Sequence, residues 1–227
     1  GSRDAGRFVS RAGEEGKAVK RTYLDHIAAT PLRAEAREAM RPFLEESFGN
    51  PQSLHAAGRE ALAAIDAARG EVAALIGATA PEVHFVSGGT EANNFALKGL
   101  ALGQQSRGRH VVVSAIEHSS VLNSVKALER QGFGSTLVPV DRDGRVDPGD
   151  VAKALTKETV LVSVMTANSE VGTVQPVAEI ASVCRSRNVL FHTDAVAAAG
   201  NIPLDVKALG VDALSLAGDQ FYGPKGT

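Results

Sequence analysis

The chain has few of the residues that would cross-link it or draw it to a charged polymer. Among its 227 residues there is one cysteine, Cys184, and no tryptophan. A single thiol excludes an internal disulfide and a Cys-x-x-Cys metal site. The net charge of −2, without a basic cluster, argues against nucleic acid as the main partner. No apolar run reaches membrane-spanning length and no signal-peptide pattern opens the sequence, so we expect a cytoplasmic protein without membrane contact.

The sequence does contain enough apolar residues for one α/β domain. Hydrophobic residues make up 44% of it, which allows a sizeable core at this length. Residues 1–21 lack apolar periodicity, so we expect a flexible leader there and one domain over 22–227. Within that domain, short apolar runs alternate with helical stripes. The runs predict strands at 82–87, 110–115, 135–140, 159–166, 189–191 and 213–216.

Local signals add predictions for single residues. Thr30 is a predicted N-cap, with Pro31 as the first helical residue. A long apolar stripe predicts a helix that ends at Gly77. Cys184 lies on an amphipathic helix and is predicted to be a small core residue. The segment 141–144 resembles a calcium loop but lacks the remaining ligands, so we predict a surface turn.

Polar residues follow several predicted strands where each strand ends. Gly89 and Thr90 come after one strand and open a helix, His118 follows another, and Asp194 ends a third. The carboxyl ends of strands in an open parallel sheet meet at one crevice, where ligands bind. A glycine-rich helix start offers free backbone N–H groups, which suit a phosphate. The sequence therefore predicts a ligand crevice with a phosphate subsite at Gly89 and Thr90.

Three runs near the end of the sequence carry a family resemblance. They read HTDA at 192–195, DALSLAG at 212–218 and FYGPKG at 221–226. Together they resemble the pyridoxal-phosphate (PLP) core of the cysteine desulfurases, which are class V aminotransferases of fold type I. The run YLDHIAATPL at 23–32 resembles the N-terminal signature of the same family. The resemblance covers about 22–227, which is the first half or more of a family member.

The resemblance implies a fold and a biochemical setting. It implies a three-layer α/β sandwich around a mostly parallel sheet, the large domain of fold type I, with the small C-terminal domain absent. It also implies PLP as cofactor, L-cysteine as substrate, a homodimer and a sulfur-acceptor protein such as an iron–sulfur scaffold. Among the residues, it implies phosphate contacts from Gly89 and Thr90 and a catalytic, ring-stacking role for His118. Asp194 would keep the pyridine nitrogen protonated.

The sequence departs from the family at several positions of that site. Gln220 stands where the family has the lysine that forms a Schiff base with PLP, and glutamine has no nucleophilic amine. Lys225 matches a second family lysine that is not catalytic. The other departures are Ser169 for asparagine, Ala197 for glutamine, Ala217 for serine and Asp219 for histidine. We therefore expect noncovalent PLP binding at these positions and weak or absent desulfurase activity.

Two other functions are compatible with the sequence. One is a non-catalytic homologue that serves as a partner or scaffold subunit. The other is a PLP-independent enzyme, perhaps with a metal, that uses His118, His192 and Asp194.

The fold-type resemblance also predicts a free slot beside the 213–216 strand. A continuation of the chain or a complementing C-terminal polypeptide would fill that slot.

Overall fold

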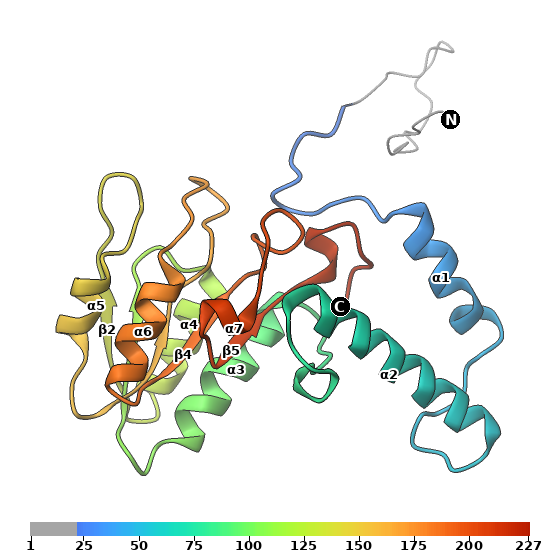
Figure 1. Ribbon diagram of the computed structural model, residues 1–227, viewed down its shortest axis with the longest axis horizontal. Helices are drawn as coiled ribbons and strands as arrows, with labels where there is room; N and C mark the ends of the chain where they lie inside the picture. The colour runs from blue at the N-terminus through green and yellow to red at the C-terminus, as the bar shows by residue number, and fades with distance from the viewer. Residues whose placement is uncertain (1–21) are drawn as a thin grey trace.

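The computed structural model describes residues 22–227 (Figure 1). The expected leader at 1–21 lies outside the described residues. Helices and strands alternate along most of the chain, as the apolar pattern predicts. The helices are α1 (Ala34–Glu45), α2 (Ala56–Ile76), α3 (Gly89–Gly103), α4 (Ser119–Glu129), α5 (Pro148–Ala154), α6 (Val177–Ser186) and α7 (Val206–Leu209). The strands are β1 (His110–Ser114), β2 (Gly134–Val138), β3 (Thr159–Ser163), β4 (Leu190–Asp194) and β5 (Ala213–Ser215), and 3-10 turns lie at Ala80–Glu82 and Gly218–Gln220.

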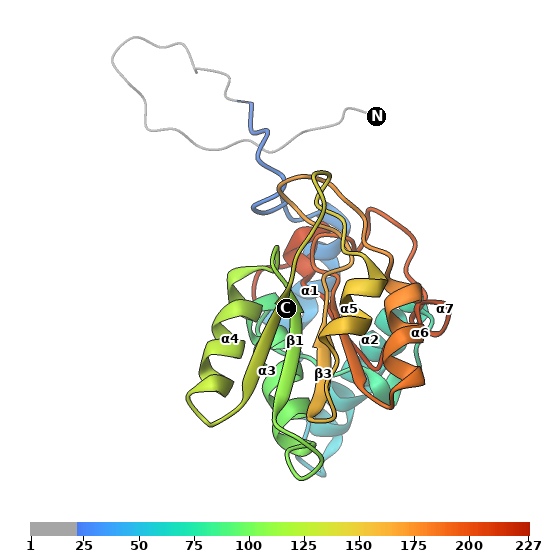
Figure 2. The ribbon, with the colours of Figure 1, turned by 90° about the vertical axis from the view of Figure 1, so that its left-hand side faces the viewer.

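The five strands form one parallel sheet in the order β2-β1-β3-β4-β5. A parallel sheet needs crossover helices, and these cover both of its faces. In Figure 2, α3 and α4 lie on one side of the strands, and α5 and α6 lie on the other. The expected three-layer α/β sandwich with a mostly parallel sheet is therefore confirmed.

Successive side chains of β1 point to opposite faces of the sheet and contribute to two hydrophobic cores. Val111 and Val113 pack with residues of α3 and α4, whereas Val112 packs with residues of α5 and α6. All three valines are at most 1% exposed. Burying such a side chain stabilises the fold by about 1.5–3 kcal/mol. Cys184 of α6 lies in the second core at 1% exposure, which confirms its prediction as a small core residue.

The helices α1 and α2 lie beside the sheet rather than on its faces (Figure 1). The helix α2 ends at Gly77, whose φ of 70° is left-handed, as predicted for a glycine C-cap. The helix α1 begins at Ala34 rather than at Pro31, so the predicted cap at Thr30 is wrong. Thr30 instead donates its hydroxyl to the Asp219 carbonyl at 2.8 Å and accepts the Tyr222 N–H at 2.6 Å. A long-range contact thus replaces the local capping role.

The strand predicted at 82–87 is absent. A 3-10 turn occupies Ala80–Glu82, and the following residues up to Gly88 have no hydrogen-bonded strand partner within 22–227. An extended run becomes a strand only when a neighbouring backbone pairs with it. The far edge of β5 likewise has no strand partner in the described part of the chain.

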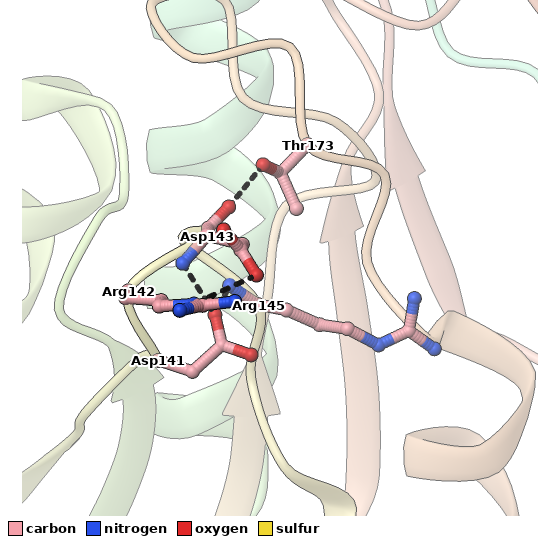
Figure 3. A network of polar contacts seen from close by, with 5 residues as sticks. All are labelled: Asp141, Arg142, Asp143, Arg145 and Thr173. Atoms are coloured by element: carbon pink, nitrogen blue, oxygen red, sulfur yellow. Dashed lines mark hydrogen bonds and ion pairs between the residues drawn. The ribbon is translucent and has the colours of Figure 1, made fainter.

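A compact turn at 141–145 supports a loop that leads to the site. Figure 3 shows Asp141 Oδ1 accepting the backbone N–H groups of Asp143 and Arg145, at 2.9 and 2.8 Å. The Thr173 hydroxyl donates to the Asp143 carbonyl and joins the turn to the loop at 168–174. Because Asp141 folds back on its own backbone, the segment forms the predicted surface turn. Among residues 22–227, no group of three or more His, Cys, Asp or Glu side chains is arranged to hold a metal.

Candidate cofactor site

One open cavity of about 530 Å³ lies at the carboxyl edge of the sheet. The start of α3, the loops after β1, β3, β4 and β5, and the segment near Asp25 enclose it. Every residue that the family resemblance assigned to the cofactor site lines this cavity. These residues are Gly89, Thr90, His118, Ser169, Asp194, Ala197, Ala217, Asp219 and Gln220. Parallel topology brings them together although they span 131 positions of sequence.

Asp194 is the buried acid of the cavity, at 5% exposure. Its Oδ1 accepts the Val196 N–H at 3.0 Å and its Oδ2 accepts the Asn93 Nδ2–H at 2.6 Å. Burial raises the pKa of Asp194, while the two N–H donors and the nearby His118 oppose that rise. A carboxylate held in this way is suited to pair with a protonated ring nitrogen.

The start of α3 forms one end of the cavity. Gly88 precedes the helix with a φ of 136°, a conformation that side chains rarely adopt. Gly89 lies so close to the loop after β4 that a Cβ atom there would be 2.7 Å from Val196 Cγ2. Glycine at this position therefore allows the start of α3 to pack closely against that loop. The first N–H groups of this 15-residue helix and its positive dipole end suit a phosphate.

The loop after β5 carries the position where the family has its lysine. Gln220 lies in the 3-10 turn Gly218–Gln220 and donates its side-chain amide to the Ala28 carbonyl at 3.1 Å. This hydrogen bond ties the loop to the N-terminal segment of the domain. No lysine or arginine lines the cavity, and Lys225 lies exposed outside it.

The charges of the cavity are mostly negative. Its lining contains four carboxylates, and His118 is the one basic side chain beside them. A phosphate carries about −1.5 to −2 charges near neutral pH, whereas a helix start supplies about +0.5. The carboxylates are Asp25, Glu170, Asp194 and Asp219. We therefore expect this cavity to hold a phosphorylated ligand less tightly than a site with a lysine.

His192 does not belong to the cavity, which corrects one expectation. Its imidazole is completely buried inside the sheet. The Nδ1 atom lies 2.9 Å from Ser163 Oγ and the Nε2 atom lies 2.9 Å from Ser215 Oγ. Burial lowers the pKa of His192 to about 3. Both ring nitrogens are occupied, so His192 cannot join His118 and Asp194 as a metal ligand.

A second buried acid, Glu117, lies behind the cavity and was not assigned a role from the sequence. Its Oε1 accepts the Ser114 hydroxyl at 2.5 Å and the Met165 N–H at 2.8 Å. Its Oε2 is buried without a protein partner. Burial raises the pKa of Glu117 to about 8, and the charge of Asp194 adds to the rise. Glu117 thus joins the ends of β1 and β3 beside His118.

Sequence reasoning also missed other lining residues. Asn93 lies one turn into α3, at 1% exposure, and contacts Asp194 directly. Its position on the same helix face as Gly89 and Thr90 could have indicated this. Asp25 and Ala28 line the cavity from a segment without regular structure, for which local pattern gives no direction.

Known proteins share the sequence and fold that form this cavity. The family model for aminotransferase class V matches residues 22–227. The chain belongs to the class V aminotransferase family. Cysteine desulfurase IscS of Dictyoglomus turgidum is 50% identical over 207 residues, which are 91% of this chain and 52% of that protein. Cysteine desulfurase IscS of Methanosarcina thermophila is 46% identical over 212 residues, or 93% of this chain and 52% of that protein.

Solved structures give the same assignment within the family. A structure described as a NifS-like protein matches with a TM-score of 0.88 and 39% identity, covering 91% of this chain and 57% of that one. A structure described as SspA in complex with cysteine matches with a TM-score of 0.87 and 38% identity, covering 91% and 59%. The chain spans about half the length of the curated relatives that it matches. Its homologues are cysteine desulfurases, and class V aminotransferases of this kind are PLP-dependent.

The residues present fit PLP in part. The start of α3 provides N–H donors for a phosphate, Asp194 provides a buried carboxylate, and His118 provides an imidazole face. Asn93 Oδ1 is a buried polar atom of the cavity wall that no protein group satisfies. Among residues 22–227, no lysine lines the cavity to bind the cofactor covalently. The described site therefore fits noncovalent binding of PLP.

Proposed function

We propose that this chain is the cofactor-holding part of a cysteine desulfurase-like protein that binds PLP noncovalently. We propose further that its desulfurase activity is weak or absent, because Gln220 replaces the lysine. One observation carries this proposal: the α3 start, His118 and Asp194 line one cavity that contains no lysine. The 50% identity to a cysteine desulfurase supports the choice of cofactor.

Each residue has a role that follows from its contacts. The N–H groups of Gly89 and Thr90 would bind the phosphate, as the positive end of a helix favours an anion. Asp194, already holding two N–H donors, would accept the proton-bearing ring nitrogen. His118 would pack against one face of the ring. PLP bound in this position supplies an electron sink for amino acid substrates.

Further elements of the proposal concern the whole protein. We propose L-cysteine as the substrate class, a homodimer, a sulfur-acceptor protein as partner and a cytoplasmic location. The match to cysteine desulfurases supports the substrate class and the type of partner. In residues 22–227 no helix is both long and apolar enough to cross a membrane. Among residues 22–227 no strand pairs with the far edge of β5, which supports pairing with a further polypeptide segment, such as a complementing C-terminal chain.

A second candidate is a non-catalytic homologue that acts as a partner or scaffold subunit. The four carboxylates in the cavity and the missing lysine favour it, because both oppose retention of PLP. The two candidates differ in whether the chain binds the cofactor at all.

Equilibrium dialysis with PLP separates the candidates. Wild-type protein should bind one PLP per chain, and Asp194→Ala should weaken binding by about 10- to 150-fold, since hydrogen bonds to a charged group contribute about 1.5–3 kcal/mol. Asp66→Ala, at an exposed position of α2, is the matched control and should leave binding unchanged. Absence of binding by the wild-type chain would favour the non-catalytic subunit.

A further inference from the structure

A chain of hydrogen bonds joins the two residues that would hold the cofactor ring. Asn93 Nδ2 donates to Asp194 Oδ2 at 2.6 Å and to Ser120 Oγ at 2.9 Å. Ser120 Oγ lies 2.7 Å from His118 Nδ1. Asn93 and Ser120 are 1% and 4% exposed, so the two hydrogen bonds that Asn93 donates are shielded from water.

The backbone of Ser120 fixes which ring nitrogen of His118 carries hydrogen. The Ser120 N–H donates to His118 Nδ1 at 3.2 Å, because His118 is the N-cap of α4. A backbone N–H can only donate, so Nδ1 must offer its lone pair. The Ser120 hydroxyl then also donates to Nδ1, and its oxygen accepts from Asn93. Hydrogen on Nδ1 would oppose the backbone N–H donor and would remove Nδ1 as the acceptor for the Ser120 hydroxyl hydrogen.

The orientation of the Asn93 amide follows from the same chain. Its Nδ2 has two hydrogens, and both are used, one toward each acceptor. The reverse orientation would set Oδ1 against the carboxylate of Asp194, which is repulsive. Its Oδ1 remains buried without a protein partner, which is the cost of this orientation. Asn93 thus donates one hydrogen to Asp194 and the other to Ser120, which in turn contacts the imidazole of His118.

We propose that Ser120 is a positioning residue that sets the tautomer of the neutral His118 imidazole, with hydrogen on Nε2. Asn93 aligns the Ser120 hydroxyl and links this state to Asp194. The inference rests on the proposed function in one respect, since it assigns His118 to the cofactor cavity. It leaves the Nε2–H as the single donor that the imidazole can offer to a ligand.

The test is the tautomer of His118 in protein without PLP. Nitrogen-15 NMR on chains labelled in the imidazole nitrogens distinguishes the two neutral forms, and the loss of signals in His118→Gln identifies them. The wild-type signal should be that of the Nε2–H form. Ser120→Ala should shift the tautomer ratio toward Nδ1–H by roughly tenfold, as expected for one lost hydrogen bond.

Two control variants test whether the effect comes from the Ser120 hydroxyl. Ser120→Thr keeps the hydroxyl and should keep the Nε2–H form, while Ser119→Ala changes an exposed neighbour and should have no effect. An Nδ1–H form in the wild-type chain would overturn the inference without any variant, and so would an unchanged ratio in a folded Ser120→Ala chain. PLP dialysis is read separately. If the wild-type chain shows the Nε2–H form but does not bind PLP, the proposed function fails and the positioning role stands.

Discussion

Replacing Glu117 by glutamine tests the electrostatics behind the cavity. The carboxyl group is buried, and its Oε1 accepts from Ser114 and from the Met165 N–H. Glutamine keeps an acceptor oxygen at Oε1 and mimics a neutral carboxylic acid in size. The substitution therefore removes the titration while it preserves the contacts that join β1 to β3.

The expected magnitude follows from the pKa of this group. Burial raises the pKa of Glu117 from 4.5 to about 8. Between those values the folded chain holds a proton that the unfolded chain releases, so the free energy of unfolding falls as pH rises. The stabilising contribution is complete below about pH 4.5 and is lost above about pH 8. At about 1.4 kcal/mol per pKa unit, the loss is at most about 5 kcal/mol.

Urea unfolding of both proteins, across about pH 5 to pH 9, measures this difference. Far-ultraviolet circular dichroism is the suitable probe, since the chain has no tryptophan. Glu117→Gln should gain stability relative to wild type as pH rises. Glu158→Gln, at an exposed site, controls for the change in net charge. A difference between Glu117→Gln and wild type that stays constant over the whole range would refute a neutral Glu117.

Other substitutions test the site and the core. Gln220→Lys should allow PLP to be fixed by borohydride, seen as added mass on the intact protein, whereas wild type should show no such adduct at this site. Gly89→Ala would place its Cβ 2.7 Å from Val196 and should destabilise the fold by about 1–3 kcal/mol in urea unfolding. Gly99→Ala has open space around it and should stabilise α3 by about 0.5–1 kcal/mol. Burial raises the pKa of the Cys184 thiol to about 12, so a thiol reagent should react with it only after denaturant is added.

The sheet could be predicted from the sequence because its strands carry strong local signals. The strands ending at Ser114 and Ser163 are short, rich in valine and bounded by polar residues. Positions at the ends of such strands converge by topology, so His118 and Asp194 could be expected at one crevice. The other cavity residues were named from the family resemblance.

The remaining errors have tertiary causes. Residues 82–87 carry a strand pattern, but a strand forms only with a partner, and the sequence does not reveal whether one is present. Thr30 has the chemistry of a cap, yet its hydroxyl bonds to the Asp219 carbonyl 189 positions away. Asn93 was not predicted as a site residue, because its contact with Asp194 depends on how α3 meets β4.

A crystal structure of the chain grown with excess PLP tests the central claim most directly. Electron density for the phosphate should lie at the N–H groups of Gly89 and Thr90. The ring should lie between His118 and Asp194, with no covalent connection to the protein. Density continuous with a lysine side chain, or a cavity that stays empty at saturating PLP, would contradict noncovalent binding at this site.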